Sequence, residues 1–141
     1  MKLLRLRNVD RAITNQIGVL VQQLSKRYPN PSAKLLQRIV KNPDYELWVM
    51  RDGKHIIGMG TLIVVSMTIG VSALLEDIVV DERYQGKGLG KAIIKKLITR
   101  AQAHKAQHID FTSNPKRTSA HSLYLKFGFE QRDTNVYRLK L

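Results

Sequence analysis

The chain has 141 residues, of which 43% are hydrophobic, and 24 Lys and Arg against 11 Asp and Glu give it a formal net charge of +13. This length is typical of one domain, and the hydrophobic content suffices for a buried core, so the charge lies on a folded surface rather than on a disordered chain. The absence of cysteine excludes disulfides, thiolate metal sites and a cysteine nucleophile. We therefore expect a single domain spanning residues 1–141.

The N-terminal segment is charged and lacks the apolar run of about 7–15 residues that a signal peptide requires, so a cytoplasmic location is expected. Residues 56–75 form an uncharged stretch of 20 residues, which is long enough to span a membrane. However, this stretch contains three glycines and is rich in Ile and Val. It is therefore predicted to form two buried strands with a break at 68–70, not a membrane helix.

Apolar residues at three- and four-residue steps predict helices, and alternating apolar residues predict strands. The predicted order is a strand at 3–7, helices at 9–24 and 35–42, strands at 45–51, 55–67 and 71–80, a helix at 88–104, a strand at 108–112, a helix at 115–127, and a closing hairpin of 129–132 with 136–139. Asp10 is expected to cap the first helix, and Gly128 to end the last one in a left-handed conformation. The strands at 71–80 and 108–112 flank a helix, so they should be parallel neighbours with a right-handed crossover.

The segment from Asp81 to Gly90 has glycines at 86, 88 and 90, basic neighbours at Lys87 and Lys91, and a predicted helix behind it. Such a loop can direct several backbone N–H groups at a phosphate, and the helix N-terminus adds a favourable field. A turn that only needs glycine flexibility is the alternative. The spacing excludes the G-x-G-x-x-G dinucleotide motif and the G-x-x-x-x-G-K-[ST] triphosphatase motif.

The run Arg83-Tyr84-Gln85-Gly86-Lys87-Gly88 resembles the [QR]-x-x-G-x-[GA] signature of GNAT acetyltransferases. The run Tyr124 to Phe129 resembles the Y-x-x-x-G-F motif in a late helix of the same family. The resemblance covers essentially the whole chain. It implies an α/β GNAT fold, a single mixed, mostly antiparallel sheet with a central splayed parallel strand pair and flanking helices.

The resemblance further implies that acetyl-CoA is the co-substrate. Many family members place Asn seven residues before the helix tyrosine, where this chain has Arg117, so the pantetheine contact is expected from Ser113 or Asn114. The residues expected to bind acetyl-CoA are Ile78, Val79, Val80, Arg83, Tyr84, Gln85, Gly86, Lys87, Gly88, Leu89, Gly90, Lys91, Asn114 and Tyr124.

Acetyl transfer to an amine needs a neutral amine, a donor for the developing oxyanion and a proton for the departing thiolate. The resemblance assigns the proton to Tyr124 and the oxyanion donor to the backbone N–H of Val79. Adjacent strand residues face opposite sides of a sheet, so only one of Glu76 and Asp77 can face the substrate pocket. Glu76 is favoured as the base, acting directly or through water. A core tyrosine and solvated carboxylates are the alternatives. The four histidines have no metal-ligand spacing, so no metal is expected.

We therefore predict an acetyl-CoA-dependent N-acetyltransferase acting on a primary amine of a small molecule, by direct attack in a ternary complex. Residues 76–81 are similar to glucosamine-phosphate acetyltransferases and residues 113–125 to aminoalkylphosphonate acetyltransferases, which disagree about the substrate. The net charge favours an anionic amine. The alternatives are a protein or peptide N-acetyltransferase, a noncatalytic acyl-CoA sensor, and a basic nucleic-acid-binding module, which no recognition motif supports. The sequence does not decide whether the chain forms a homodimer.

The basic residues are unevenly distributed. Residues 83–105 contain seven Lys or Arg and no acid. This run begins at the glycine loop, where a cofactor with several phosphates would lie. It accounts for part of the net charge, whereas the 11 basic residues before Ile56 have no assigned role.

Overall fold

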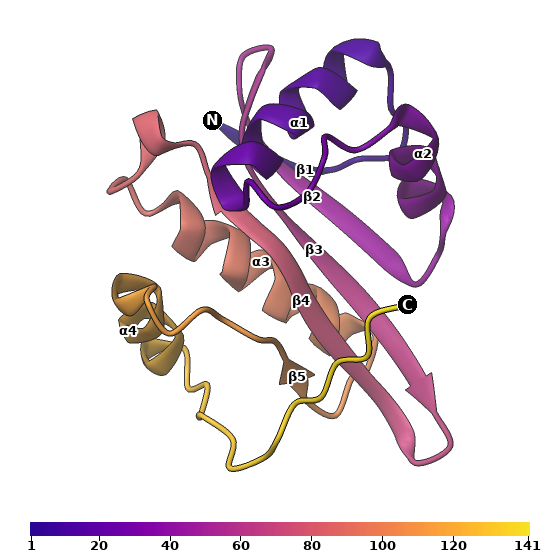
Figure 1. Ribbon diagram of the computed structural model, residues 1–141, viewed down its shortest axis with the longest axis vertical. Coiled ribbons are helices and arrows are strands. Elements are labelled where there is room, and N and C mark those ends of the chain that lie inside the picture. Colours follow the sequence, from indigo (N-terminus) through magenta and orange to yellow (C-terminus); the bar gives the residue numbers. More distant parts are fainter. The chain divides into compact units, whose positions relative to one another are not determined.

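One mixed sheet organises residues 1–111. The computed structural model describes residues 1–141 and separates into two compact units, the sheet unit (1–111) and the C-terminal unit (112–141), each described by itself. The sheet unit contains β1 (Lys2–Arg5), α1 (Arg11–Leu24), α2 (Ala33–Lys41), β2 (Tyr45–Asp52), β3 (His55–Met67), β4 (Gly70–Val80), a 3₁₀ turn (Glu82–Tyr84), α3 (Leu89–Ala103) and β5 (Ile109–Asp110) (Figure 1). The C-terminal unit contains α4 (Thr118–Lys126). A single domain over residues 1–141 stays a prediction.

The strand order is β1-β2-β3-β4-β5, antiparallel throughout except for β4 and β5, which pair in parallel. This confirms the predicted fold class. The parallel pairing is confined to Ala73 and Leu74 on β4, so the two strands are unpaired beyond Leu74. Consequently β5 is only two residues long, against the five predicted.

The long uncharged stretch 56–75 forms parts of β3 and β4, joined by a two-residue turn at Thr68 and Ile69. The predicted pair of strands with a break is thus confirmed. None of the helices has the length and the apolar character that a membrane-spanning helix requires. Gly53, at φ +57, makes the corresponding two-residue turn between β2 and β3.

The helices begin at the caps that their sequences supply. Asp10 accepts the backbone N–H of Ile13 at 2.8 Å, and Ser32 accepts that of Leu35 at 3.1 Å. Gly88 caps α3 without a side chain, in the left-handed conformation. Each of these helices begins at its cap and packs its apolar face against the sheet.

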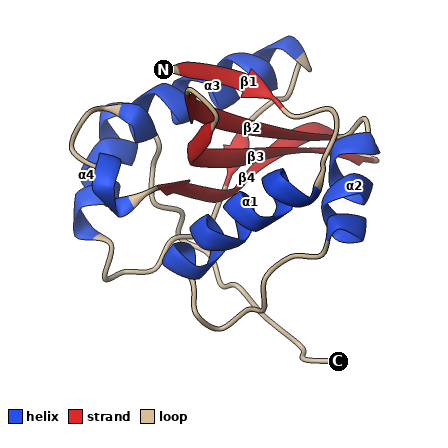
Figure 2. Ribbon diagram, turned by 90° about the horizontal axis from the view of Figure 1, so that it is seen from above, coloured by secondary structure: helices blue, strands red, loops and turns tan.

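Two layers of helices cover the sheet, with α1 and α2 on one face and α3 on the other (Figure 2). The α1 and α2 side packs a core against β2, β3 and β4. Its members are Leu6, Val9, Ile17, Leu20, Leu36, Val40, Leu47, Val49, Ile56, Met59 and Val79. Burying one such side chain completely stabilises the fold by about 1.5–3 kcal/mol.

Glycines in β3 allow α3 to approach the opposite face closely. A Cβ at Gly60 would lie 2.8 Å from Cγ2 of Ile93 and 3.0 Å from Cδ1 of Leu97, and a Cβ at Gly58 would lie 3.1 Å from Cδ1 of Ile93. Side chains of α3 therefore occupy the space that a β3 side chain would fill. These glycines set the height of α3 above the sheet.

A buried carboxylate fastens the C-terminal part of α3. Glu46 is fully buried and accepts hydrogen bonds from Arg100 at 2.8 and 2.9 Å, His104 at 2.8 Å, Trp48 at 2.9 Å and Arg5 at 3.2 Å. Burial alone raises its pKa, but the hydrogen bonds outweigh burial and hold the pKa at about 2. Glu46 is thus ionised at neutral pH.

The C-terminal unit differs from the prediction beyond α4. Gly128 has φ +89, as expected for a left-handed cap, but the closing hairpin is wrong, because residues 129–141 contain no strand. Val136, Tyr137 and Leu139 are 76%, 88% and 83% exposed. An isolated two-stranded hairpin is marginal in water, and here its apolar side chains bury nothing that would stabilise it. For this reason β5 is the last strand of the sheet, and the parallel pair stands at the end of the sheet instead of at its centre, where it was predicted.

Candidate active site

The glycine loop presents open backbone at the start of α3. Gly86 and Gly88 have φ values of +77 and +76, and nothing lies within 4 Å of a Cβ built on either residue. The first helical hydrogen bond runs from the N–H of Ala92 to the carbonyl of Gly88, so the preceding N–H groups of Leu89 to Lys91 have no acceptor within the helix. This geometry suits an anion that approaches the backbone.

The side chains around the loop are already engaged with the protein. Arg83 donates to the buried carboxylate of Asp81, at 3.1 Å from Nε and 2.8 Å from Nη2. Gln85 donates to the carbonyl of Val80 at 3.1 Å, and Nζ of Lys87 stands 5.2 Å from the ring centre of Tyr84. The pKa of Asp81 is lowered, chiefly by the hydrogen bonds from Arg83. These contacts shape the loop, while the backbone faces open space.

Strand β4 carries a bulge next to the loop. Its register with β3 shifts by one residue, so that Asp77 and Ile78 both stand opposite Gly60. Asp77 has φ +54, a left-handed conformation that is uncommon for residues other than glycine and that the first residue of a G1 bulge, usually glycine, adopts. Sequence reasoning missed this feature, because no glycine or asparagine marks it.

The bulge bears on the predicted oxyanion donor. The N–H of Asp81, just after β4, donates to the carbonyl of Ile57 on β3 at 2.9 Å, and Val79 lies two residues earlier, in β4 opposite Met59. Since backbone N–H groups alternate between the two edges of a strand, the N–H of Val79 also faces β3. The prediction that the N–H of Val79 points at the thioester carbonyl is therefore wrong. The N–H groups of Ile78 and Val80 face the other edge of β4.

Two carboxylates stand at the bulge. Burial raises the pKa of Glu76, and the neighbouring charge of Asp77 raises it further, whereas the pKa of Asp77 is raised by burial alone. No cation contributes to either shift. A carboxylate with a raised pKa and no cationic partner is suited to accept a proton.

Within the C-terminal unit, Tyr124 is half-buried on α4 and lies among aromatic rings, with ring centres 6.3 Å from His121 and 6.4 Å from Phe129. The side chain of Asn114 accepts the N–H of Lys116 at 2.9 Å, which closes a local turn. The hydroxyl of Ser113 is buried without a hydrogen-bond partner. Of the two residues expected at the pantetheine, Ser113 thus has the unused polar group.

The predicted residues fall into two groups. The sheet unit brings the bulged strand and the glycine loop together, whereas Tyr124 and Asn114 belong to the C-terminal unit. Their joint role stays a prediction. Sequence reasoning also left Asp81 without a role, although an Asp two residues before Arg at the start of a turn signals a local cap.

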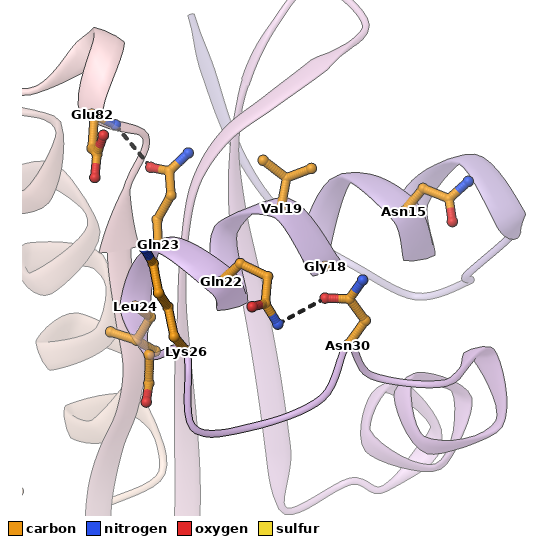
Figure 3. Close-up of a pocket in the computed structure, with 10 residues that line it drawn as sticks. Asn15, Gly18, Val19, Gln22, Gln23, Leu24, Lys26, Asn30 and Glu82 are labelled. Atoms are coloured by element: carbon orange, nitrogen blue, oxygen red, sulfur yellow. Dashed lines mark hydrogen bonds between the residues drawn. The ribbon is translucent and has the colours of Figure 1, made fainter.

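An open groove of about 880 Å³ lies along α1 and contains none of the predicted residues (Figure 3). It is lined by Asn15, Gly18, Val19, Gln22, Gln23, Leu24, Ser25, Lys26, Asn30 and Glu82. Gly18 lets the segment that contains Asn30 approach α1 closely, because a Cβ at position 18 would lie 3.2 Å from Cγ of Asn30. The groove meets the glycine loop only where Gln23 contacts Glu82.

Solved structures of acetyltransferases share this fold. An aminoglycoside acetyltransferase from an uncultured soil sample has a TM-score of 0.82 and 21% identity, with 99% of this chain and 96% of that chain covered. An acetyltransferase from Trypanosoma brucei has a TM-score of 0.79 and 24% identity, with 99% of each chain covered. Glucosamine-6-phosphate N-acetyltransferase from Arabidopsis thaliana has a TM-score of 0.79 and 17% identity, with 99% of each chain covered. The sheet and its helices thus define an acetyltransferase fold.

The model of the acetyltransferase (GNAT) domain matches residues 14–140, so the chain belongs to the GNAT acetyltransferase family. A curated relative is the spermine/spermidine N(1)-acetyltransferase of Bacillus subtilis, which is 42% identical over 57 residues. The match spans 40% of this chain and 38% of that enzyme.

Proposed function

We propose that this member of the GNAT family is an N-acetyltransferase that uses acetyl-CoA to acetylate a primary amine of a small molecule. The observation that carries the proposal is the glycine loop, where two left-handed glycines leave open space beside the unpaired N–H groups of a helix N-terminus. A pyrophosphate needs such a set of backbone donors. Gly86, Gly88 and the N–H groups of residues 89–91 would hold it, with Lys87 and Lys91 as nearby cations.

Acetyl-CoA would supply the acetyl group as an activated thioester. The N–H groups of Ile78 and Val80 would donate to the carbonyl oxygen as negative charge develops there, because both face the free edge of β4 and are fixed before the reaction. Glu76 would take a proton from the attacking amine, directly or through water. Tyr124 would give a proton to the departing thiolate, and Ser113 would contact the pantetheine. Without cysteine, the amine would attack the thioester directly.

Two observations support a small amine. The relative from Bacillus subtilis is named for spermine and spermidine, and one protein of similar fold is named for aminoglycosides. All of these compounds are small molecules with several amino groups. In addition, two acidic side chains, Glu76 and Asp77, stand together at the bulge and no cation contributes to the pKa of either, which favours a positively charged acceptor. The anionic amine suggested by the net charge of +13 is the competing substrate class.

The test is an acceptor panel of polyamines, aminoglycosides, amino sugars, aminophosphonates, amino acids and peptide N-termini, with release of free CoA thiol as the readout. We expect turnover with a small amine and a lower kcat in Tyr124→Phe. Binding of acetyl-CoA by calorimetry without turnover on any acceptor would indicate a sensor, and turnover on peptides alone would indicate a peptide acetyltransferase. Absence of both binding and turnover would refute the proposal.

A further inference from the structure

A glutamine on α1 holds the first residues of the glycine loop. Oε1 of Gln23 accepts the N–H of Glu82, the residue after Asp81, at 3.0 Å (Figure 3). The partners are 59 residues apart in sequence, so this contact exists only in the folded chain. It joins α1, on one face of the sheet, to the loop that leads into α3 on the other face.

Asp81 is the centre of this arrangement. It is 2% exposed, and its carboxylate accepts the N–H of Arg83 at 3.0 Å in addition to the two guanidinium bonds. The side chain of Arg83 is 78% exposed. The guanidinium is thus turned toward a buried carboxylate, although most of its surface faces solvent. If Arg83 only supplied positive charge to an anionic ligand, its two hydrogen bonds to Asp81 would serve no purpose in binding that ligand.

We propose that Gln23, Asp81 and Arg83 form a clasp that holds the glycine loop in its anion-binding conformation before acetyl-CoA arrives. The inference rests on the proposed function. The clasp assigns Arg83 a positioning role in place of the direct contact predicted for it. Its physical basis is pre-organisation, because a loop that is already ordered loses little conformational freedom when the ligand binds.

The clasp and simple electrostatics predict opposite signs for one substitution. Asp81 is an anion five residues before Gly86, in a loop that would bind phosphates. If charge alone mattered, Asp81→Asn would remove a repulsion and strengthen binding. If the clasp matters, the same change weakens binding, since the neutral amide holds Arg83 less well. Arg83→Lys is the complementary change, because it keeps the positive charge and loses the paired bond.

The experiment measures acetyl-CoA affinity by calorimetry, KM and kcat, and hydrogen exchange of the Glu82 amide in the ligand-free protein. For Asp81→Asn and Arg83→Lys we expect about tenfold weaker binding and a raised KM, with kcat unchanged. For Gln23→Ala we expect about tenfold faster exchange at Glu82. Gln22→Ala is the matched control, because Nε2 of Gln22 donates only to the carbonyl of Tyr28 and to Asn30, each at 3.0 Å. This variant should behave like the wild type.

Tighter or unchanged binding in Asp81→Asn, or wild-type affinity in Arg83→Lys together with weak binding in Arg83→Ala, would overturn the clasp. If Asp81→Asn lowers Tm strongly, the two surface variants at Gln23 and Arg83 decide the question. Failure of the wild type to bind acetyl-CoA would refute the proposed function instead. In that case exchange at Glu82 still tests the clasp, because it is measured without ligand.

Discussion

The buried carboxylate beneath α3 allows a quantitative prediction. Glu46→Gln keeps the shape of the side chain but removes the charge that Arg5, Arg100 and His104 face. The pKa of Glu46 is lowered from 4.5 to about 2, and one pKa unit corresponds to about 1.4 kcal/mol. The folded state therefore favours the ionised form by roughly 3 kcal/mol, at the lower end of the ~3–5 kcal/mol expected for breaking a buried ion pair.

Urea unfolding at pH 7, followed by circular dichroism, should show a free energy of unfolding about 3 kcal/mol lower for Glu46→Gln, with a Tm lower by about 10 °C. Glu130→Gln is the control, because Glu130 is exposed and should leave stability nearly unchanged. A loss below about 1 kcal/mol in Glu46→Gln would refute the account of this cluster.

The pH dependence gives a second test of the same group. The pKa of Glu46 is lower in the folded than in the unfolded chain, so its contribution is complete above about pH 4.5 and disappears as the pH falls toward 2. The wild type should therefore lose more stability than Glu46→Gln between these values, and the two curves should converge at low pH. Parallel curves would show that the charge of Glu46 does not stabilise the fold.

Three further predictions concern the site and its support. Gly60→Ala places a Cβ 2.8 Å from Ile93, so we expect about 1–3 kcal/mol of destabilisation in urea unfolding; unchanged stability would mean that α3 shifts freely. Gly88→Ala and Gly53→Ala carry similar backbone strain at φ +76 and +57 in open space, roughly 1–2 kcal/mol each, but calorimetry should find acetyl-CoA affinity lost only in Gly88→Ala. Equal affinity in the two variants would remove Gly88 from the site. If Glu76 is the base, kcat/KM should fall as the pH drops through a value above 4.5, and Asp77→Asn should move that inflection to lower pH, because Asp77 helps to raise the pKa of Glu76. An inflection that Asp77→Asn does not move would exclude Glu76.

Local patterns were sufficient for most of the elements. The caps at Asp10 and Gly128, the turn at Gly53 and the glycine loop depend on neighbours within a few residues, so the sequence predicts them directly. The closing hairpin fails for the converse reason. Its alternating pattern is present in residues 129–139, but a strand also requires a partner and a buried face, which a local pattern does not supply.

The candidate site likewise has features that local sequence predicts and features that depend on contacts in the folded chain. Sequence alone determined the family motif, the order of strand, loop and helix, and the absence of a cysteine nucleophile. Only the tertiary structure decided which backbone groups face the free edge of β4, because a bulge at Asp77 and the pairing with β3 set the N–H directions at Val79 and Val80. It likewise brought Gln23 to the loop, where it contacts a residue 59 positions away in the sequence. Hydrogen-bond direction and contacts between distant residues arise from packing in three dimensions, which a linear motif does not encode.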